Sequence, residues 1–160
     1  MKRLRSRGVR LEFRLEEWEG ELFRDVLMRY PYMPPAPARL SRGGGIPRQE
    51  AADRLLEESL AGQRAALKRQ VTGLLEDIHA FRTDRAGWRL SLEPAKADWL
   101  IQVLNEVRVS AWVRLGSPDD LDGQRAKPPN PEMQLIEVTA YFQSFFIESL
   151  SGAAPGEEAA

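Results

Sequence analysis

Asn105, Arg108 and Arg114 are the polar residues whose placement could support recognition of an anion. They lie in residues 98–116, where apolar residues recur at intervals of three and four. Arg108 falls inside the apolar face of the expected helix, and Asn105 lies one turn before it. A buried arginine needs a carboxylate or several carbonyl groups beside it, because an unpaired buried charge is costly. The three residues are therefore a candidate anion or partner site. In one form of this site, Asn105 and Arg108 would line a ligand-binding pocket. A structural salt bridge of Arg108 is the alternative that we favour.

His79 is the one histidine of the chain, and Glu76 precedes it by three residues. The two side chains could share a metal ion, but the chain has no cysteine and no second histidine to complete a zinc-type set. Nucleophile-elbow, zinc-protease and phosphate-loop patterns are absent, and the glycines at 43–45 lack the lysine and preceding strand of a phosphate loop. We therefore interpret His79 as a surface residue and expect no catalytic residue, no metal site and no cofactor.

The N-terminus is strongly basic, with six Lys or Arg residues and a single Glu in the first fourteen positions. Such an arm could contact phosphates, which would make the protein a nucleic-acid-binding transcriptional regulator. Aromatic interleaving and helix-turn-helix spacing are both absent from the sequence. We therefore interpret the basic N-terminus as solvated and do not expect nucleic acid to be the partner.

The composition is that of an ordinary globular protein. The 160 residues are 42% hydrophobic and 29% charged, with a formal net charge of −1 and no cysteine. The lack of cysteine fits a reducing compartment. Neither a signal-peptide core nor a run of about 20 apolar residues is found, so we expect a cytoplasmic protein with no membrane partner.

Two segments have the strongest helical patterns. In residues 98–116 the apolar positions cover most of the circumference, so we expect this helix to be enclosed by the other elements. Residues 131–150 carry seven large apolar side chains at helical spacing. Asn130 followed by Pro131 predicts where the second of these helices begins.

Four other elements follow from periodicity. Residues 16–30 have a helical pattern, and residues 49–81 read as one helix about 50 Å long. That length exceeds what a compact domain of this size needs, so the helix either bends or projects. Alternation predicts short strands at 9–15 and 88–92, and we expect these two strands to pair.

The predicted fold is therefore mostly α: a helical bundle of about four helices with a small two-stranded β ribbon. Residues 1–150 are expected to form a single helical domain. A Pro/Gly-rich loop at 31–47 and a second loop at 117–130 connect its parts. We expect residues 151–160 to be a disordered tail.

Residues 98–108 read Asp-Trp-Leu-Ile-Gln-Val-Leu-Asn-Glu-Val-Arg, and residues 114–116 read Arg-Leu-Gly. Together with the aromatic helix that follows, this segment resembles a bacterial family of unknown function, DUF2017. The resemblance implies a small, mostly helical cytoplasmic protein. Members of that family in actinobacteria tend to be encoded beside ClpS, the adaptor of the Clp protease, which implies a connection with regulated proteolysis.

We therefore expect a non-enzymatic helical interaction module, an accessory in Clp-dependent regulated proteolysis. The absence of catalytic motifs, the overlong helix and the aromatic-rich last helix motivate this expectation. Its partner is expected to be a protein, and a homodimer is one form that the partnership could take.

Overall fold

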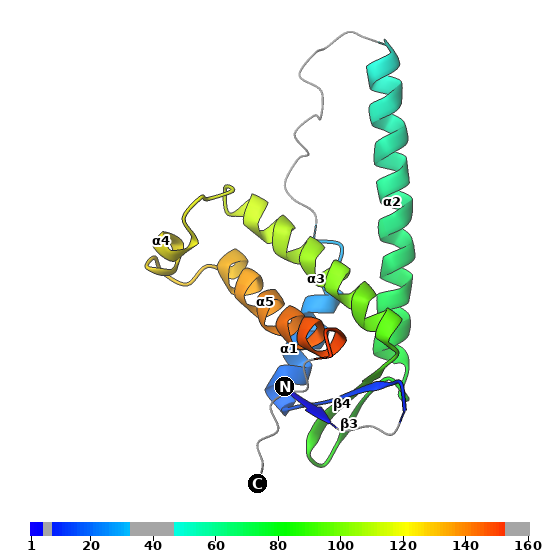
Figure 1. Cartoon of the computed structure of the whole chain (residues 1–160). Coiled ribbons are helices and arrows are strands. Elements are labelled where there is room, and N and C mark those ends of the chain that lie inside the picture. The colour runs from blue at the N-terminus through cyan, green and yellow to red at the C-terminus, as the bar shows by residue number, and fades with distance from the viewer. Residues whose placement is uncertain (5–7, 33–46, 153–160) are drawn as a thin grey trace.

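The computed structural model describes residues 1–4, 8–32 and 47–152. This part of the chain is mostly helical, as predicted, and holds one small antiparallel sheet (Figure 1). In chain order the elements are β1 (Lys2–Leu4), β2 (Leu11–Leu15), α1 (Glu17–Met28), α2 (Pro47–Glu76), β3 (Phe81–Asp84), β4 (Gly87–Leu92), α3 (Pro94–Arg114), α4 (Leu121–Arg125) and α5 (Pro131–Leu150). Most of the predicted loop at 31–47 and most of the predicted tail at 151–160 lie outside the described residues.

The sheet has the strand order β1-β2-β4-β3. The predicted pairing of two strands is confirmed, because β2 and β4 are antiparallel neighbours with Phe13 opposite Leu90. The prediction of a two-stranded ribbon is wrong, since β1 and β3 add one strand at each edge. β1 has only three residues, too few to show alternation, and β3 begins at Phe81, which the helical pattern had placed at the end of the long helix.

One face of the sheet packs against α1 and α5. Phe13 and Phe146 meet edge-on with ring centroids 5.3 Å apart, and Phe23 of α1 lies 5.1 Å from Phe142 in the same way. All four rings are fully buried. Edge-on pairs of this kind add to the free energy gained from burial, so these rings hold the sheet and the two helices together.

α3 packs along α5 and is enclosed on one side only, so the prediction that the other elements enclose this helix is only partly right: Val109 is 48% exposed, and Arg108 is exposed as well. Leu104 and Val107 have no exposed surface. The helix ends in a Schellman motif: Gly116 N–H donates to the Val113 carbonyl, and Ser117 N–H donates to the Trp112 carbonyl, both at 3.0 Å. The positive φ of Gly116, 97°, is the conformation that this motif requires.

α2 ends at Glu76, five residues before the predicted end at Phe81, and a turn then leads into β3. Near its end Val71 and Leu74 are buried, whereas residues 48–52 and 54–59 are exposed. Of the two predicted alternatives, projection is the one that the structure shows. Figure 1 shows the first half of α2 extending past α3 with no other described element beside it.

The predicted loop at 117–130 contains the short helix α4, so the prediction of an unstructured connection is only partly right. The predicted start of α5 is confirmed. The Asn130 side chain accepts hydrogen bonds from the N–H groups of Glu132 and Met133, and Pro131 occupies the first turn. None of the described helices is both long enough and apolar enough to span a lipid bilayer.

Candidate interaction surfaces

Arg108 and Asn105 lie on the exposed side of α3, which corrects the prediction that Arg108 is inside the apolar face. Arg108 Nη1 lies 3.5 Å from Oε1 of Gln143 on α5, and Arg108 forms no ion pair with any described residue. Gln143 also donates to the Ile101 carbonyl at 3.2 Å. The neighbour of Arg108 is therefore a neutral amide that bridges α3 and α5, and neither the predicted salt bridge nor a closed anion pocket is seen.

Arg114 is the last residue of α3 and has different neighbours. Its guanidinium carbon is 4.5 Å from the centroid of the Tyr32 ring, a cation–π contact. Tyr32 in turn donates a hydrogen bond to Glu132 Oε1 at 3.3 Å. The pKa of Tyr32 is raised, first by burial and second by the negative charge of Glu132. The structure joins Arg114 to the start of α5 by these contacts and brings it into no contact with Asn105 or Arg108.

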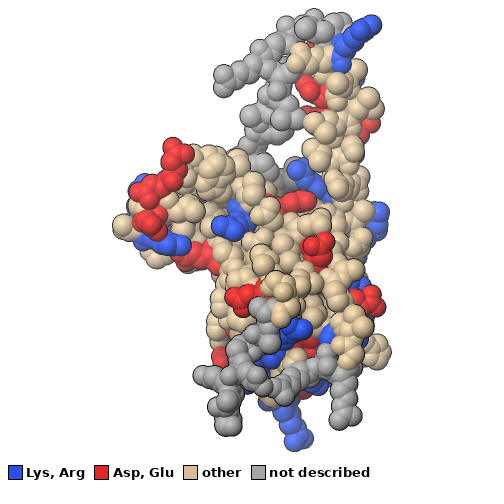
Figure 2. Space-filling model, in the orientation of Figure 1, with Lys and Arg blue, Asp and Glu red and all other residues tan. Residues whose placement is uncertain are grey.

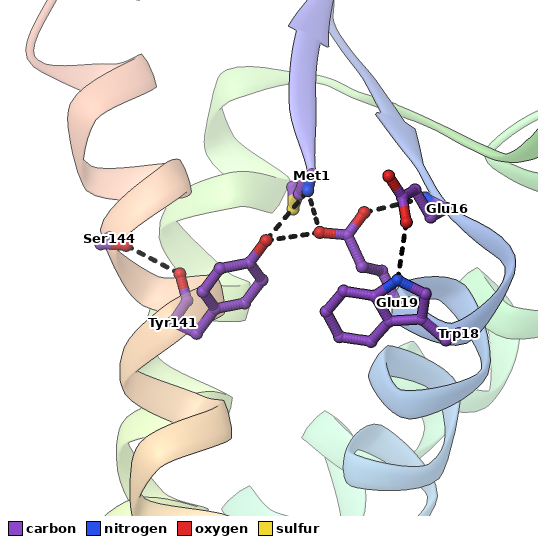
Figure 3. Close-up of polar contacts among 6 residues, drawn as sticks. All are labelled: Met1, Glu16, Trp18, Glu19, Tyr141 and Ser144. Carbon is purple, nitrogen blue, oxygen red and sulfur yellow. Dashed lines mark hydrogen bonds and ion pairs between the residues drawn. The ribbon is translucent and has the colours of Figure 1, made fainter.

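Glu19 on α1 is a charged side chain that is almost fully buried, with 2% of its surface exposed. Its carboxylate accepts hydrogen bonds from the Met1 ammonium and from the Tyr141 hydroxyl (Figure 3). The Met1 nitrogen is also 3.0 Å from the Tyr141 oxygen. Three segments far apart in the sequence thus converge on one carboxylate.

The electrostatics of this cluster, Met1–Glu19–Tyr141, follow from the contacts. Burial alone would raise the pKa of Glu19, but the hydrogen bonds from Met1, Tyr141 and the Glu16 backbone outweigh it and lower that pKa. Burial, together with the hydrogen bond to Glu19, raises the pKa of Tyr141 to about 12. Glu19 is therefore held ionised, and Tyr141 is held neutral.

Glu19 has a local role as well, which the sequence could have indicated. The Glu16 N–H donates to Glu19 Oε2 at 2.8 Å, and the Glu16 side chain accepts from the Glu19 backbone, completing a capping box at the start of α1. The three-residue spacing of Glu16 and Glu19 is the signal for this box. Nothing local signals the contacts with Met1 and Tyr141, which are 18 and 122 residues away.

The projecting part of α2 carries exposed apolar side chains. Leu55 is 68% exposed and Leu56 is 45% exposed. They belong to a strip of residues that recur at intervals of three and four and carry no charge, which we call the uncharged strip: Ala52, Leu55, Leu56, Ser59, Gly62, Gln63, Ala66, Gln70 and Gly73. All of them are exposed except Ala66, which is half-buried. A continuous strip without charge along one face of a helix is typical of helices that pair with another helix.

Charges on the other faces of α2 are separated along the helix. Residues 48–62 contain four acids and two arginines, a formal charge of −2, whereas residues 63–75 contain Arg64, Lys68 and Arg69 and no acid. The base of the projection is tied to the body by two of these cations. Arg64 Nε lies 4.0 Å from Glu106 of α3, and Lys68 donates to the Met28 carbonyl at 3.1 Å.

His79 lies in the turn after α2 and is exposed. It lines a hollow of about 210 Å³ together with Glu12, Arg82, Arg89 and Ser91 of the sheet. Glu76 remains on α2, and no group of three potential metal ligands is found in the described residues. His79 therefore contributes an exposed imidazole to the sheet surface.

The fold and these surfaces define a mostly helical protein in which a small sheet and a projecting helix are the accessible features. No family model, no curated protein and no solved structure matches this chain. The resemblance of residues 98–116 to DUF2017 stays a prediction.

Proposed function

We propose that this protein is a non-enzymatic interaction module whose binding element is the projecting half of α2. The observation that carries the proposal is the exposure of Leu55 and Leu56 on a helix segment that no described element covers. Isolated helical segments gain most of their stability by packing an apolar face against another element. The uncharged strip supplies that face.

The partner that the charges favour is a second copy of this chain, with the two α2 helices antiparallel. This direction places the acidic first half of each helix against the basic second half of the other, and it also opposes the two helix dipoles. A parallel pair would place like charges together. The opposed helix dipoles and the overall charge of the two halves therefore favour the antiparallel direction.

A register centred between Leu60 and Ala61 fits the side chains of the uncharged strip. It places Leu55 of each helix beside Ala66 of the other, and Ser59 beside Gly62. Large side chains then lie opposite small ones, which allows close packing of two helices.

The oligomeric state tests this proposal. Light scattering after size exclusion, over a range of concentrations, is expected to show a dimer for the natural sequence and a monomer for Leu55→Glu combined with Leu56→Glu. Ile78→Glu is the matched control, since Ile78 is 69% exposed but lies in the turn beyond α2. A monomer at all concentrations, or equal loss of the dimer in the control, contradicts the proposal.

The resemblance to DUF2017 supports a further assignment, that the module serves as an accessory in Clp-dependent regulated proteolysis in the cytoplasm. Mixing the purified protein with the ClpS adaptor of the same organism tests this by a sedimentation shift. We expect a complex that survives Arg108→Met, because Arg108 is exposed and holds only a Gln143 contact. The absence of any complex contradicts the Clp assignment and leaves the α2 pairing to be judged by light scattering.

A further inference from the structure

Four cations, one from each strand, form a single row across the outer face of the sheet. Lys2 of β1 lies opposite Arg14 of β2, and Arg14 lies opposite Arg89 of β4. Arg82 of β3 lies opposite Arg89 on its other side. Paired residues on neighbouring strands share a face, and the apolar residues Phe13 and Leu90 point to the other one. We call these four residues the cation row.

The cation row places like charges side by side. Neighbouring strands lie about 4.8 Å apart, so the row is roughly 14 Å long. Like charges directly opposite each other on a sheet are destabilising. Arg14 is relieved by Asp84 at 3.1 Å, and Arg89 Nε lies 3.8 Å from Glu12. The other two cations, Lys2 and Arg82, are exposed and have no ion-pair partner within the described parts of the chain.

Groups without positive charge border the cation row on both sides. Glu12 and Ser91 are paired in the register on one side, and Asp84 and Gly87 are paired on the other. The hollow of about 210 Å³ that also includes His79 opens beside Arg82 and Arg89. Figure 2 shows Lys and Arg side chains at the end of the molecule that holds the sheet. The described strand residues next to the cation row on this face are therefore acidic or neutral.

We propose that the cation row binds the phosphate backbone of a nucleic acid without reading its base sequence. A strand of duplex DNA carries one phosphate per about 3.4 Å of axis, so a row of roughly 14 Å can face about four phosphates. None of the four strands presents an aromatic ring on this face among the described residues, so base stacking is not available. The acidic borders disfavour a flat anionic membrane, which would also have to face Glu12 and Asp84.

This inference differs from the expectation drawn from the basic N-terminal arm alone. Lys2 and Arg14 belong to that arm, but Arg82 and Arg89 come from a distant hairpin, and only the antiparallel pairing of four strands aligns them. The cation row does not involve α2. Its failure in an experiment would therefore leave the α2 proposal intact, and the reverse also holds.

Fluorescence anisotropy with a labelled mixed-sequence duplex of about 20 base pairs tests the proposal. Four phosphate contacts predict a slope of log K against log salt near −3.6, which is on the order of a 100-fold loss of affinity between 50 and 200 mM salt. Lys2→Gln combined with Arg82→Gln is expected to halve that slope. Neither side chain has a described intramolecular partner, so the double variant is expected to remain folded, as its circular dichroism melting curve would show.

Arg24→Gln combined with Lys127→Gln is the matched control, because it removes the same charge from exposed positions away from the sheet. It should keep the natural slope. A single-stranded probe of equal length should bind with a slope near −2.8, since single strands release fewer counterions per contact. Absence of binding to both probes at 50 mM salt, an equal effect of the control, or retention on anionic lipid vesicles in place of nucleic acid would each overturn the proposal.

Discussion

Tyr30 Oη donates a hydrogen bond to Glu106 Oε2 at 3.0 Å and so joins the end of α1 to the middle of α3. Glu106 also lies 4.0 Å from Arg64 of α2. Tyr30 is 1% exposed. Its pKa is raised, first by this burial and second by the contact with Glu106. This chain of three residues connects the body of the protein to the base of the projecting helix.

Tyr30→Phe is expected to lower the free energy of unfolding by about 1 kcal/mol, the typical net value of a partly buried hydrogen bond. Glu106 is partly exposed and can bind water instead, which limits the loss. Tyr32→Phe is the control, because its hydrogen bond to Glu132 is longer at 3.3 Å and should be worth less. Urea denaturation measures both; an unchanged midpoint for Tyr30→Phe would contradict the contact.

Gly20 and Gly73 should respond to alanine in opposite directions. A Cβ at Gly20 would overlap the ring of Trp88, and overpacking of this kind typically costs 1–3 kcal/mol, about the range expected here. A Cβ at Gly73 on α2 meets nothing within 4 Å. Gly73→Ala should therefore stabilise the helix by roughly 0.5–1 kcal/mol through its higher helix propensity. Thermal denaturation of the two variants distinguishes them, and a shift of the same sign in both would contradict the packing of α1 on β4.

Glu19→Gln should destabilise the protein at neutral pH by about 3 kcal/mol, because it leaves the Met1 ammonium buried without its counter-charge. The pKa of Glu19 is lowered in the folded state from its ordinary value of 4.5. Its ionised form therefore stabilises the fold fully above pH 4.5, and this contribution is lost as pH falls through the lowered pKa. Unfolding measured from pH 7 downward should show a steeper acid loss in the natural protein than in Glu19→Gln.

Glu17→Gln on the same helix serves as the control, since Glu17 is exposed and should change stability by only a few tenths of a kcal/mol. If the natural protein and Glu19→Gln lost stability in parallel as the solution is acidified, Glu19 could not be the buried counter-charge of Met1.

The three tyrosines should not ionise near pH 10, the ordinary pKa of a tyrosine, while the protein is folded. The pKa of Tyr141 is raised to about 12, and the pKa values of Tyr30 and Tyr32 are raised as well. Their protonated forms stabilise the fold fully below pH 10, and this stabilisation is lost as pH rises from 10 toward 12. Tyrosinate absorbance should therefore stay low near pH 10 in the folded protein and appear there in denaturant. Ionisation of one tyrosine near pH 10 without unfolding would contradict these hydroxyl contacts.

Features that depend on neighbours along the chain were predictable from the sequence. The buried face of α3 follows from the spacing of Leu104 and Val107 and their neighbours, and the start of α5 follows from Asn130 and Pro131. Each is decided within a few residues by side-chain direction or by capping.

Features that depend on distant segments were missed. β1 exists only because β2 offers it an edge, and the cation row needs the register of all four strands. The position of Arg108 was misjudged because helical spacing gives an angle around the axis but not the place where α5 packs. The buried role of Glu19 could not be predicted, since its contacts with Met1 and Tyr141 are entirely non-local.

The antiparallel pairing of two α2 helices is the central claim, and a distance between two spin labels tests it most directly. The chain has no cysteine, so Arg48→Cys gives each copy one labelling site at the tip of α2. In an antiparallel pair centred between residues 60 and 61, the two tips are 25 helical residues apart, which corresponds to about 38 Å along the axis.

Double electron–electron resonance on this variant is expected to give a distance distribution centred near 40 Å, the axial separation combined with an interaxial distance of about 9 Å. Adding Leu55→Glu and Leu56→Glu should abolish the dipolar signal, because the uncharged strip can then no longer pack. Loss of the 40 Å distance with dipolar broadening of the continuous-wave spectrum, from labels about 10 Å apart, would show a parallel pair. A signal indistinguishable from separate molecules would show a monomer, and either result contradicts the account.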